Sequence, residues 1–104
     1  MANADWDGFV AAQPELAETL RPFLKQSLAA GALDVAQKEL IVIVLLGAQG
    51  YAAGIRSHAL RALEAGATAD ELREALTLLI AFAGIGRFLE AYPIVEAAIA
   101  EDGC

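Results

Sequence analysis

This sequence has very few of the residues that carry metal and redox chemistry. It contains one cysteine, Cys104, and one histidine, His58. A single thiol cannot form an internal disulfide or a paired-cysteine zinc site, and a lone histidine without clustered ligands is a poor metal site. We therefore expect no metal and no cofactor. The lack of disulfides is typical of a reducing compartment.

Basic residues and long apolar runs are also scarce. Seven Lys and Arg face 14 Asp and Glu, which gives a net charge of −7. Neutralising phosphates requires a basic face, so we expect no nucleic-acid partner and no anionic lipid surface. The longest uncharged apolar run, Leu40 to Ile55, is shorter than the ~18 residues of a membrane span. The first residues, MANADWDGF, do not resemble a signal peptide, so we expect a soluble, cytoplasmic protein.

Apolar residues, in contrast, are abundant. They make up 58% of the 104 residues, and many are alanine or leucine, which favour helices. This length is typical of one domain with a small core. Because a small monomer cannot bury so much apolar surface, we expect an identical chain to cover part of it.

The apolar residues recur with helical spacing, and strand-like alternation is absent. The pattern predicts a first helix that starts at Pro14, is kinked or divided at Pro22, and ends at Gly31. Trp6 and Phe9 lie in a segment before it that would dock on the bundle or on a neighbouring chain. The apolar face of this helix, expected in the core or an interface, comprises Leu16, Leu20, Phe23, Leu24 and Leu28.

A second helix is predicted from Asp34 to about Gln49, with Gln37 completing a capping box. From Leu40 to Leu46 it is apolar all round, which indicates a buried central helix. Gly50 then provides a bend, and a third helix covers about Ala52 to Ala65.

A fourth helix is predicted to begin at Thr68, which forms a capping box with Glu71. The residues Gly84-Ile85-Gly86 interrupt it, and a fifth helix runs from about Arg87 towards Ile99 with a kink at Pro93. We therefore expect an all-α bundle of about five helices, a single domain over residues 1–104 with a core at about 14–100.

Glu39 and His58 are the candidate catalytic residues. Glu39 lies 11 residues before Gly50 and His58 lies 8 after it. In an antiparallel hairpin with ~1.5 Å rise per residue, the two side chains would stand within about one helical turn. An acid and a histidine that converge in an apolar setting can transfer protons. The alternative is a structural histidine that bonds only a helix end or Glu39.

Four residues in or directly before the predicted third helix are candidates for substrate binding: Tyr51, Gly54, Arg56 and Arg61. Tyr51, Gly54 and His58 share one helix face by their spacing. Gly54 would leave room beside the imidazole, and Tyr51 offers a hydroxyl group. Arg56 and Arg61 could each meet a carboxylate.

The sequence also resembles a known family, the carboxymuconolactone decarboxylase or AhpD-like superfamily. The matching pieces span about residues 33–90 and are LD at 33–34, ELI at 39–41, IRSH at 55–58, AGAT at 65–68 and AG at 83–84. The resemblance implies an all-α fold completed by homo-oligomerisation, as trimers or hexamers of dimers.

The resemblance also separates two activities. The alkylhydroperoxidase branch of the family carries Cys-x-x-Cys followed by x-x-x-His, with a glutamate upstream. Its cysteine positions fall here on Tyr51 and Gly54, whereas Glu39 and His58 are retained. Because peroxidase turnover needs two thiols, their absence argues against this activity unless Cys104 reaches the site.

The decarboxylase branch does without the cysteine pair. The resemblance therefore implies a cofactor-free lyase or isomerase that acts by acid/base chemistry on a small carboxylated lactone or keto-acid-like compound. The alternative is a non-catalytic member of the family, either an oligomeric scaffold or a small-ligand-binding protein, because a fold alone does not carry function.

Overall fold

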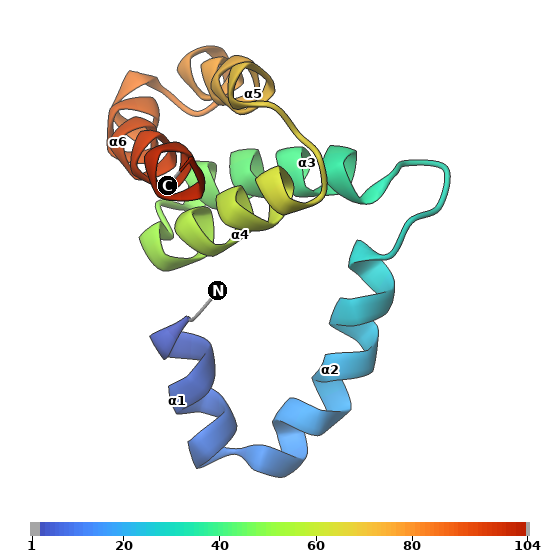
Figure 1. Cartoon of the computed structure of the whole chain (residues 1–104). Helices are drawn as coiled ribbons and strands as arrows, with labels where there is room; N and C mark the ends of the chain where they lie inside the picture. The colour runs from blue at the N-terminus through green and yellow to red at the C-terminus, as the bar shows by residue number, and fades with distance from the viewer. Residues whose placement is uncertain (1–2, 104) are drawn as a thin grey trace.

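The computed structural model describes residues 3–103, which form α-helices joined by short connections and contain no strand (Figure 1). The helices are α1 (Ala4–Ala12), α2 (Pro14–Leu28), α3 (Val35–Gln49), α4 (Ala52–Glu64), α5 (Ala69–Phe82) and α6 (Ile85–Asp102). The all-α expectation is confirmed, and the described residues contain six helices rather than about five. None of these helices combines the length and the apolarity that a membrane crossing requires.

The additional helix is α1, in the segment that the sequence pattern left before the first helix. Asn3 caps it, since its side-chain oxygen accepts hydrogen bonds from the N–H groups of Asp5 and Trp6. The apolar residues of this short helix do not gather on one face, and none of its residues is buried. Periodicity therefore gave no signal for it.

Local sequence explains where the other helices begin. Asp34 and Gln37 form a reciprocal capping box at the start of α3, and Thr68 and Glu71 form one at the start of α5, as predicted. Gly50 ends α3 in the left-handed region, with φ of 71°. Glycine adopts this conformation without a steric penalty, so the chain can turn directly into α4.

The prolines inside helices do not divide them. The pattern predicted a kink or a division at Pro22 and a kink at Pro93. Helix α2 continues through Pro22, so it is not divided there, and α6 continues through Pro93. Each proline removes one backbone donor, while the turns on either side keep their own hydrogen bonds.

Helices α3 to α6 form the packed body of the molecule, which we call the core bundle (residues 35–102). The hairpin of α3 and α4 lies on one side, and α5 and α6 pack across it (Figure 1). Its centre is apolar, and the largest fully buried side chains are Ile43, Ile55, Leu72, Leu76, Leu79 and Val95. This core fixes the relative positions of α3 and α4.

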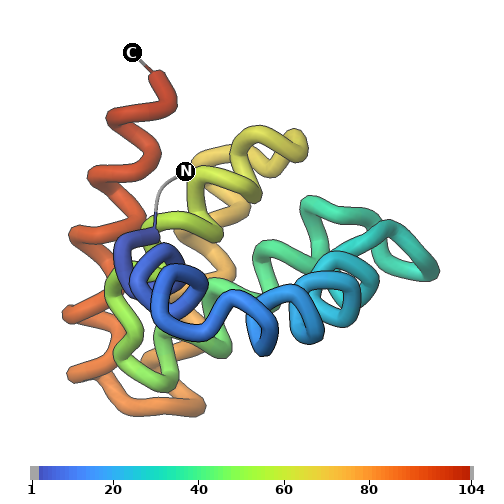
Figure 2. The backbone as a smooth tube through the Cα atoms, turned by 90° about the horizontal axis from the view of Figure 1, so that it is seen from below, coloured from blue at the N-terminus to red at the C-terminus, as the bar shows by residue number. Residues whose placement is uncertain are grey.

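Helices α1 and α2 form a second part, which we call the arm (residues 4–28). The arm makes a V that stands against one side of the core bundle (Figures 1 and 2). At one end, the hydroxyl of Tyr51 donates a hydrogen bond to Asp5 (Oη–Oδ2, 3.0 Å). At the other end, Lys38 donates to the carbonyls of Ser27 and Ala29 at 3.0 and 2.7 Å. Polar contacts therefore tether both ends of the arm.

Much of the expected apolar core lies on the surface of this chain. Of the α2 residues only Ala17 is buried, and the predicted apolar face is largely exposed, with Phe23 at 68%. The predicted all-round burial of α3 is also wrong, because Ile41 and Leu45 are exposed. Within residues 3–103 no element covers these faces.

Candidate active site

Glu39 on α3 and His58 on α4 meet inside the hairpin. The Oε2 atom of Glu39 lies 2.6 Å from Nδ1 of His58. The Glu39 side chain is 3% exposed and the His58 side chain 19%. A bond this short between a carboxylate and an imidazole is typical of a charge-assisted hydrogen bond. The structure thus brings the two candidate catalytic residues together.

The packing of α4 explains this placement. The turn at Gly50 is closed by a hydrogen bond from the N–H of Tyr51 to the carbonyl of Leu46 (3.1 Å). From there α4 returns along α3 with Ile55 and Ala59 buried in the shared core. His58 immediately precedes Ala59, so its ring lies at the border of the core, where the side chain of Glu39 meets it.

The pair opens onto a cavity of about 720 Å³ between the core bundle and the arm. The bundle side of the cavity is formed by Glu39, Val42, Ser57, His58 and Arg61. The arm side is formed by Asn3, Trp6, Asp7, Arg21, Leu24, Lys25, Ser27, Leu28 and Ala29. The cavity is large enough for a small organic molecule.

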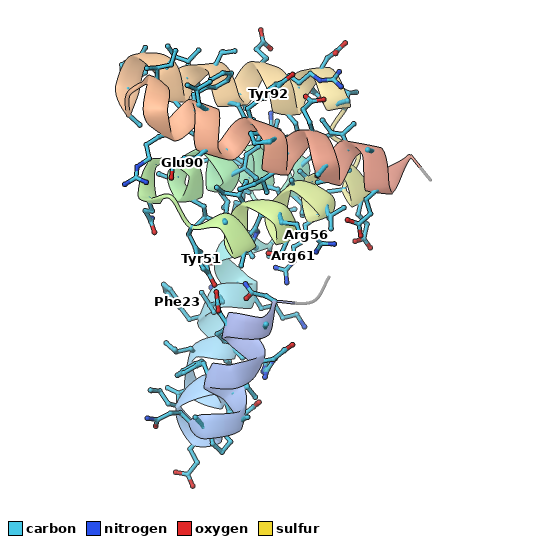
Figure 3. The ribbon with its side chains drawn as sticks, turned by 90° about the vertical axis from the view of Figure 1, so that its left-hand side faces the viewer. Phe23, Tyr51, Arg56, Arg61, Glu90 and Tyr92 are labelled. Carbon is cyan, nitrogen blue, oxygen red and sulfur yellow. The ribbon has the colours of Figure 1, made fainter. Side chains whose placement is uncertain are left out.

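The polar groups at this cavity differ in how they are bonded. Ser57 is buried and donates to the carbonyl of Gly54 (3.3 Å), so its hydroxyl is already engaged. Arg61 is exposed and lines the cavity, and Figure 3 shows it on the side of the bundle that faces the arm. Arg61 is therefore positioned to meet an anionic ligand beside the Glu39–His58 pair.

The other candidate substrate-binding residues lie outside the cavity lining. Tyr51 points towards the arm and bonds Asp5 (Figure 3). A β-carbon at Gly54 would lie 2.6 Å from the Tyr51 ring and 2.9 Å from Leu46, so these side chains fill the space expected beside the imidazole.

Arg56 pairs with Glu101 at 2.9 and 2.7 Å. Cys104 lies outside the described residues.

Sequence reasoning missed the arm side of the cavity, above all Trp6, Arg21 and Lys25. The guanidinium of Arg21 lies 5.6 Å from the centre of the Trp6 ring, within the range of a cation–π contact. The i, i+4 spacing of Arg21 and Lys25 was a visible signal, because it places both on one face of α2. Nothing local in the sequence indicated that this face turns towards the hairpin.

Among residues 3–103 no group of three or more His, Cys, Asp or Glu side chains could hold a metal ion. What the site offers chemically is a bonded acid–imidazole pair, a cation and a cavity.

Comparison with known proteins identifies the class. The sequence matches the carboxymuconolactone decarboxylase family over residues 14–97, so the chain belongs to this family and to the AhpD-like superfamily. It is similar in structure to apo-lpg0406, a carboxymuconolactone decarboxylase family protein from Legionella pneumophila. The TM-score is 0.84 at 27% sequence identity, over 97% of this chain and 89% of that one. No curated protein matches the sequence.

Proposed function

We propose that the protein is a cofactor-free lyase or isomerase that acts on a small carboxylated lactone or keto-acid-like compound. The observation that carries this proposal is the 2.6 Å contact between Glu39 and His58 at the wall of an open cavity. Family membership supports a carboxymuconolactone decarboxylase-like protein. The acid/base chemistry rests on the pair itself.

His58 would be the group that exchanges protons with the substrate. Its Nδ1 atom is engaged by Glu39, so Nε2 is the ring nitrogen left for the substrate. When the ring is neutral and Nδ1–H donates to the carboxylate, Nε2 accepts a proton. When the ring is protonated, Nε2–H donates one. Glu39 orients the ring through this hydrogen bond.

A decarboxylation at this site needs no cofactor, because the substrate's own carbonyl group accepts the electron pair. The bond between the substrate carbon and its carboxylate breaks, and the electron pair flows towards a carbonyl oxygen β to that carboxylate. Carbon dioxide leaves, and the carbon receives a proton from Nε2 of His58. Arg61 would orient an anionic group of the substrate from the cavity wall.

The environment of the pair supports an enzyme over a non-catalytic member of the family. A scaffold would tie both side chains to backbone groups and fill the space around them. The Glu39–His58 bond suits a structural histidine as well as a catalytic one, and the cavity of about 720 Å³ that His58 borders is what favours the enzyme. Alkylhydroperoxidase activity has no support at the site, because Tyr51 and Gly54 occupy the cysteine positions of that branch.

We also propose that the chain works as a homo-oligomer. An apolar groove between α3 and α5 includes Ile41, Val44, Leu45 and Leu78 in its lining. On the arm, Phe23 and its apolar neighbours are exposed as well. Exposed apolar surface on this scale is typical of faces that another subunit covers.

The test is a substrate screen with carboxylated lactones and β-keto acids, read against His58→Gln. If His58 transfers the proton, kcat of this variant falls about 100-fold or more, the usual size of a general acid/base contribution. Arg87→Gln is the control, because Arg87 pairs with Glu90 on the surface of α6. Full turnover by His58→Gln on a compound that the wild type converts would contradict the mechanism.

A further inference from the structure

Two of the basic side chains differ from the others because they have no hydrogen-bond or ion-pair partner among residues 3–103. The sequence has seven Lys and Arg residues. Four lie outside the cavity lining, and each donates to a carboxylate or a backbone carbonyl. These four are Lys38, Arg56, Arg73 and Arg87.

The remaining three basic residues all line the cavity beside the Glu39–His58 pair. Arg21 pairs with Glu18 at 3.1 Å and lies over the Trp6 ring. The side chains of Lys25 and Arg61 have no hydrogen bond or ion pair to any other residue within 3–103. In a chain with 14 acidic residues, the two basic side chains without a partner therefore face the same cavity.

These two cations approach the cavity from different parts of the molecule. Lys25 lies on α2 in the arm, and Arg61 lies on α4 in the core bundle. Asp7 and Glu39 are the acidic residues in the lining. Glu39 is bonded to His58, and Asp7 lies on α1. An anion in the cavity is thus attracted by Lys25 from the arm side and by Arg61 from the bundle side, and neither of these side chains is paired with an acid.

We propose that Lys25 and Arg61 together form one carboxylate-binding subsite between the arm and the core bundle. The flat guanidinium of Arg61 can bond both oxygens of a carboxylate, and the ammonium of Lys25 supplies a mobile point charge at the end of a flexible stem. Lys25 is thereby a substrate-binding residue. The choice of a carboxylate as the ligand rests on the proposed function, whereas the pairing of the two cations rests on their place in the lining of one cavity.

The subsite is testable by binding, without turnover. Laevulinate, a small keto acid, serves as the probe, and its uncharged methyl ester serves as the matched ligand. Affinity is measured by calorimetry on the full chain, and Trp6, the single tryptophan, reports by its fluorescence whether the ligand enters the cavity.

We expect Lys25→Gln and Arg61→Gln each to weaken laevulinate binding about five- to tenfold, the effect of losing one charge-assisted hydrogen bond. Binding of the methyl ester should not change. Lys25→Arg should retain most of the affinity, and Arg61→Lys should retain less, because it keeps the charge but loses the bidentate contact. Arg87→Gln should match the wild type. In the double variant Lys25→Gln/Arg61→Gln, the loss should be smaller than the product of the two single losses, because both cations hold one carboxylate.

Several results would overturn the subsite. The proposal is wrong if either glutamine variant binds laevulinate as tightly as the wild type, or if the losses of affinity in the double variant are strictly multiplicative. It is also wrong if the protein binds inorganic phosphate more tightly than laevulinate, or if the wild type does not bind laevulinate. These results differ from a failure of the proposed function, which is read from turnover by His58→Gln. If both cation variants lose affinity for laevulinate and His58→Gln keeps full turnover, the carboxylate-binding subsite is supported and the proposed proton transfer by His58 is wrong.

Discussion

Glu39 and His58 form a side-chain contact of 2.6 Å that joins α3 to α4 across the hairpin. The two residues are not equally exposed, since the Glu39 side chain is almost fully buried and the His58 ring reaches the cavity. Both residues line the cavity, and the imidazole is the more accessible of the two. Removing one partner has a different consequence from removing the other.

This asymmetry predicts unequal losses of stability at neutral pH. His58→Ala leaves the carboxyl group of Glu39 buried without its partner, and we expect the free energy of unfolding to fall by about 2–4 kcal/mol. Glu39→Gln keeps the shape and one hydrogen bond, and we expect a loss of about 1 kcal/mol or less. Urea denaturation of the two variants measures both values. Equal losses would show that burial of Glu39 does not dominate the energetics of the pair.

The hairpin could be predicted from sequence because its signals are local. Asp34 and Gln37 mark the start of α3, Gly50 marks the turn, and helical rise then brings Glu39 and His58 to the same level. The rotation of the two helices could not be predicted, because it depends on the packing of the whole core. The same holds for Lys25, whose place at the cavity depends on contacts between the arm and residues far away in the chain.

Gly54 gives a prediction about packing. A β-carbon there would approach the ring of Tyr51 and the side chain of Leu46 too closely. Alanine favours helices over glycine by about 1 kcal/mol, but we expect Gly54→Ala to lower stability by about 1–2 kcal/mol because the site becomes overpacked. The loss should shrink in a Tyr51→Ala background. Gly86→Ala is the control, because open space surrounds Gly86. Stabilisation by Gly54→Ala would contradict the packing of Tyr51 against this glycine.

Tyr51 also gives a prediction about the arm. Tyr51→Phe removes the hydroxyl that bonds Asp5 at 3.0 Å and keeps the ring. We expect faster amide hydrogen exchange in α1 and altered Trp6 fluorescence, with global stability lowered by less than about 1 kcal/mol, because the lost hydrogen bond is exposed. Tyr92→Phe is the matched control on α6, since Tyr92 is exposed and lies outside the arm. Unchanged exchange in α1 would mean that the hydroxyl does not tether the arm.

The ion pair between α5 and α6 predicts a pH dependence of stability. Hydrogen bonds from Arg73 at 2.8 and 3.0 Å, together with its charge, lower the pKa of Glu96 from its ordinary value of 4.5, against the raising effect of burial. A lowered pKa in the folded state means that the pair stabilises the protein above pH 4.5 and that this contribution is lost as the pH falls through the folded-state pKa.

The measurement is the melting temperature of the wild type, Glu96→Gln and Glu90→Gln from neutral to acidic pH. Glu96→Gln should melt lower than the wild type at neutral pH, and the two curves should converge in acid. Glu90→Gln is the control, since Glu90 pairs with Arg87 within one helix and does not join two helices. A constant difference between the wild type and Glu96→Gln at every pH would rule out titration of this pair as the cause.

The exposed apolar faces give a prediction about assembly. If a second copy of the chain covers the arm and the groove between α3 and α5, a charge placed in either face should separate the subunits, because an unpaired charge is costly to bury. Phe23→Glu on the arm and Leu45→Glu in the groove are the test variants. Gln26→Glu is the matched control, since it adds the same charge at an exposed polar position of α2. Sedimentation velocity should show an oligomer for the wild type and Gln26→Glu and smaller species for the two test variants, and a monomeric wild type would contradict the assembly.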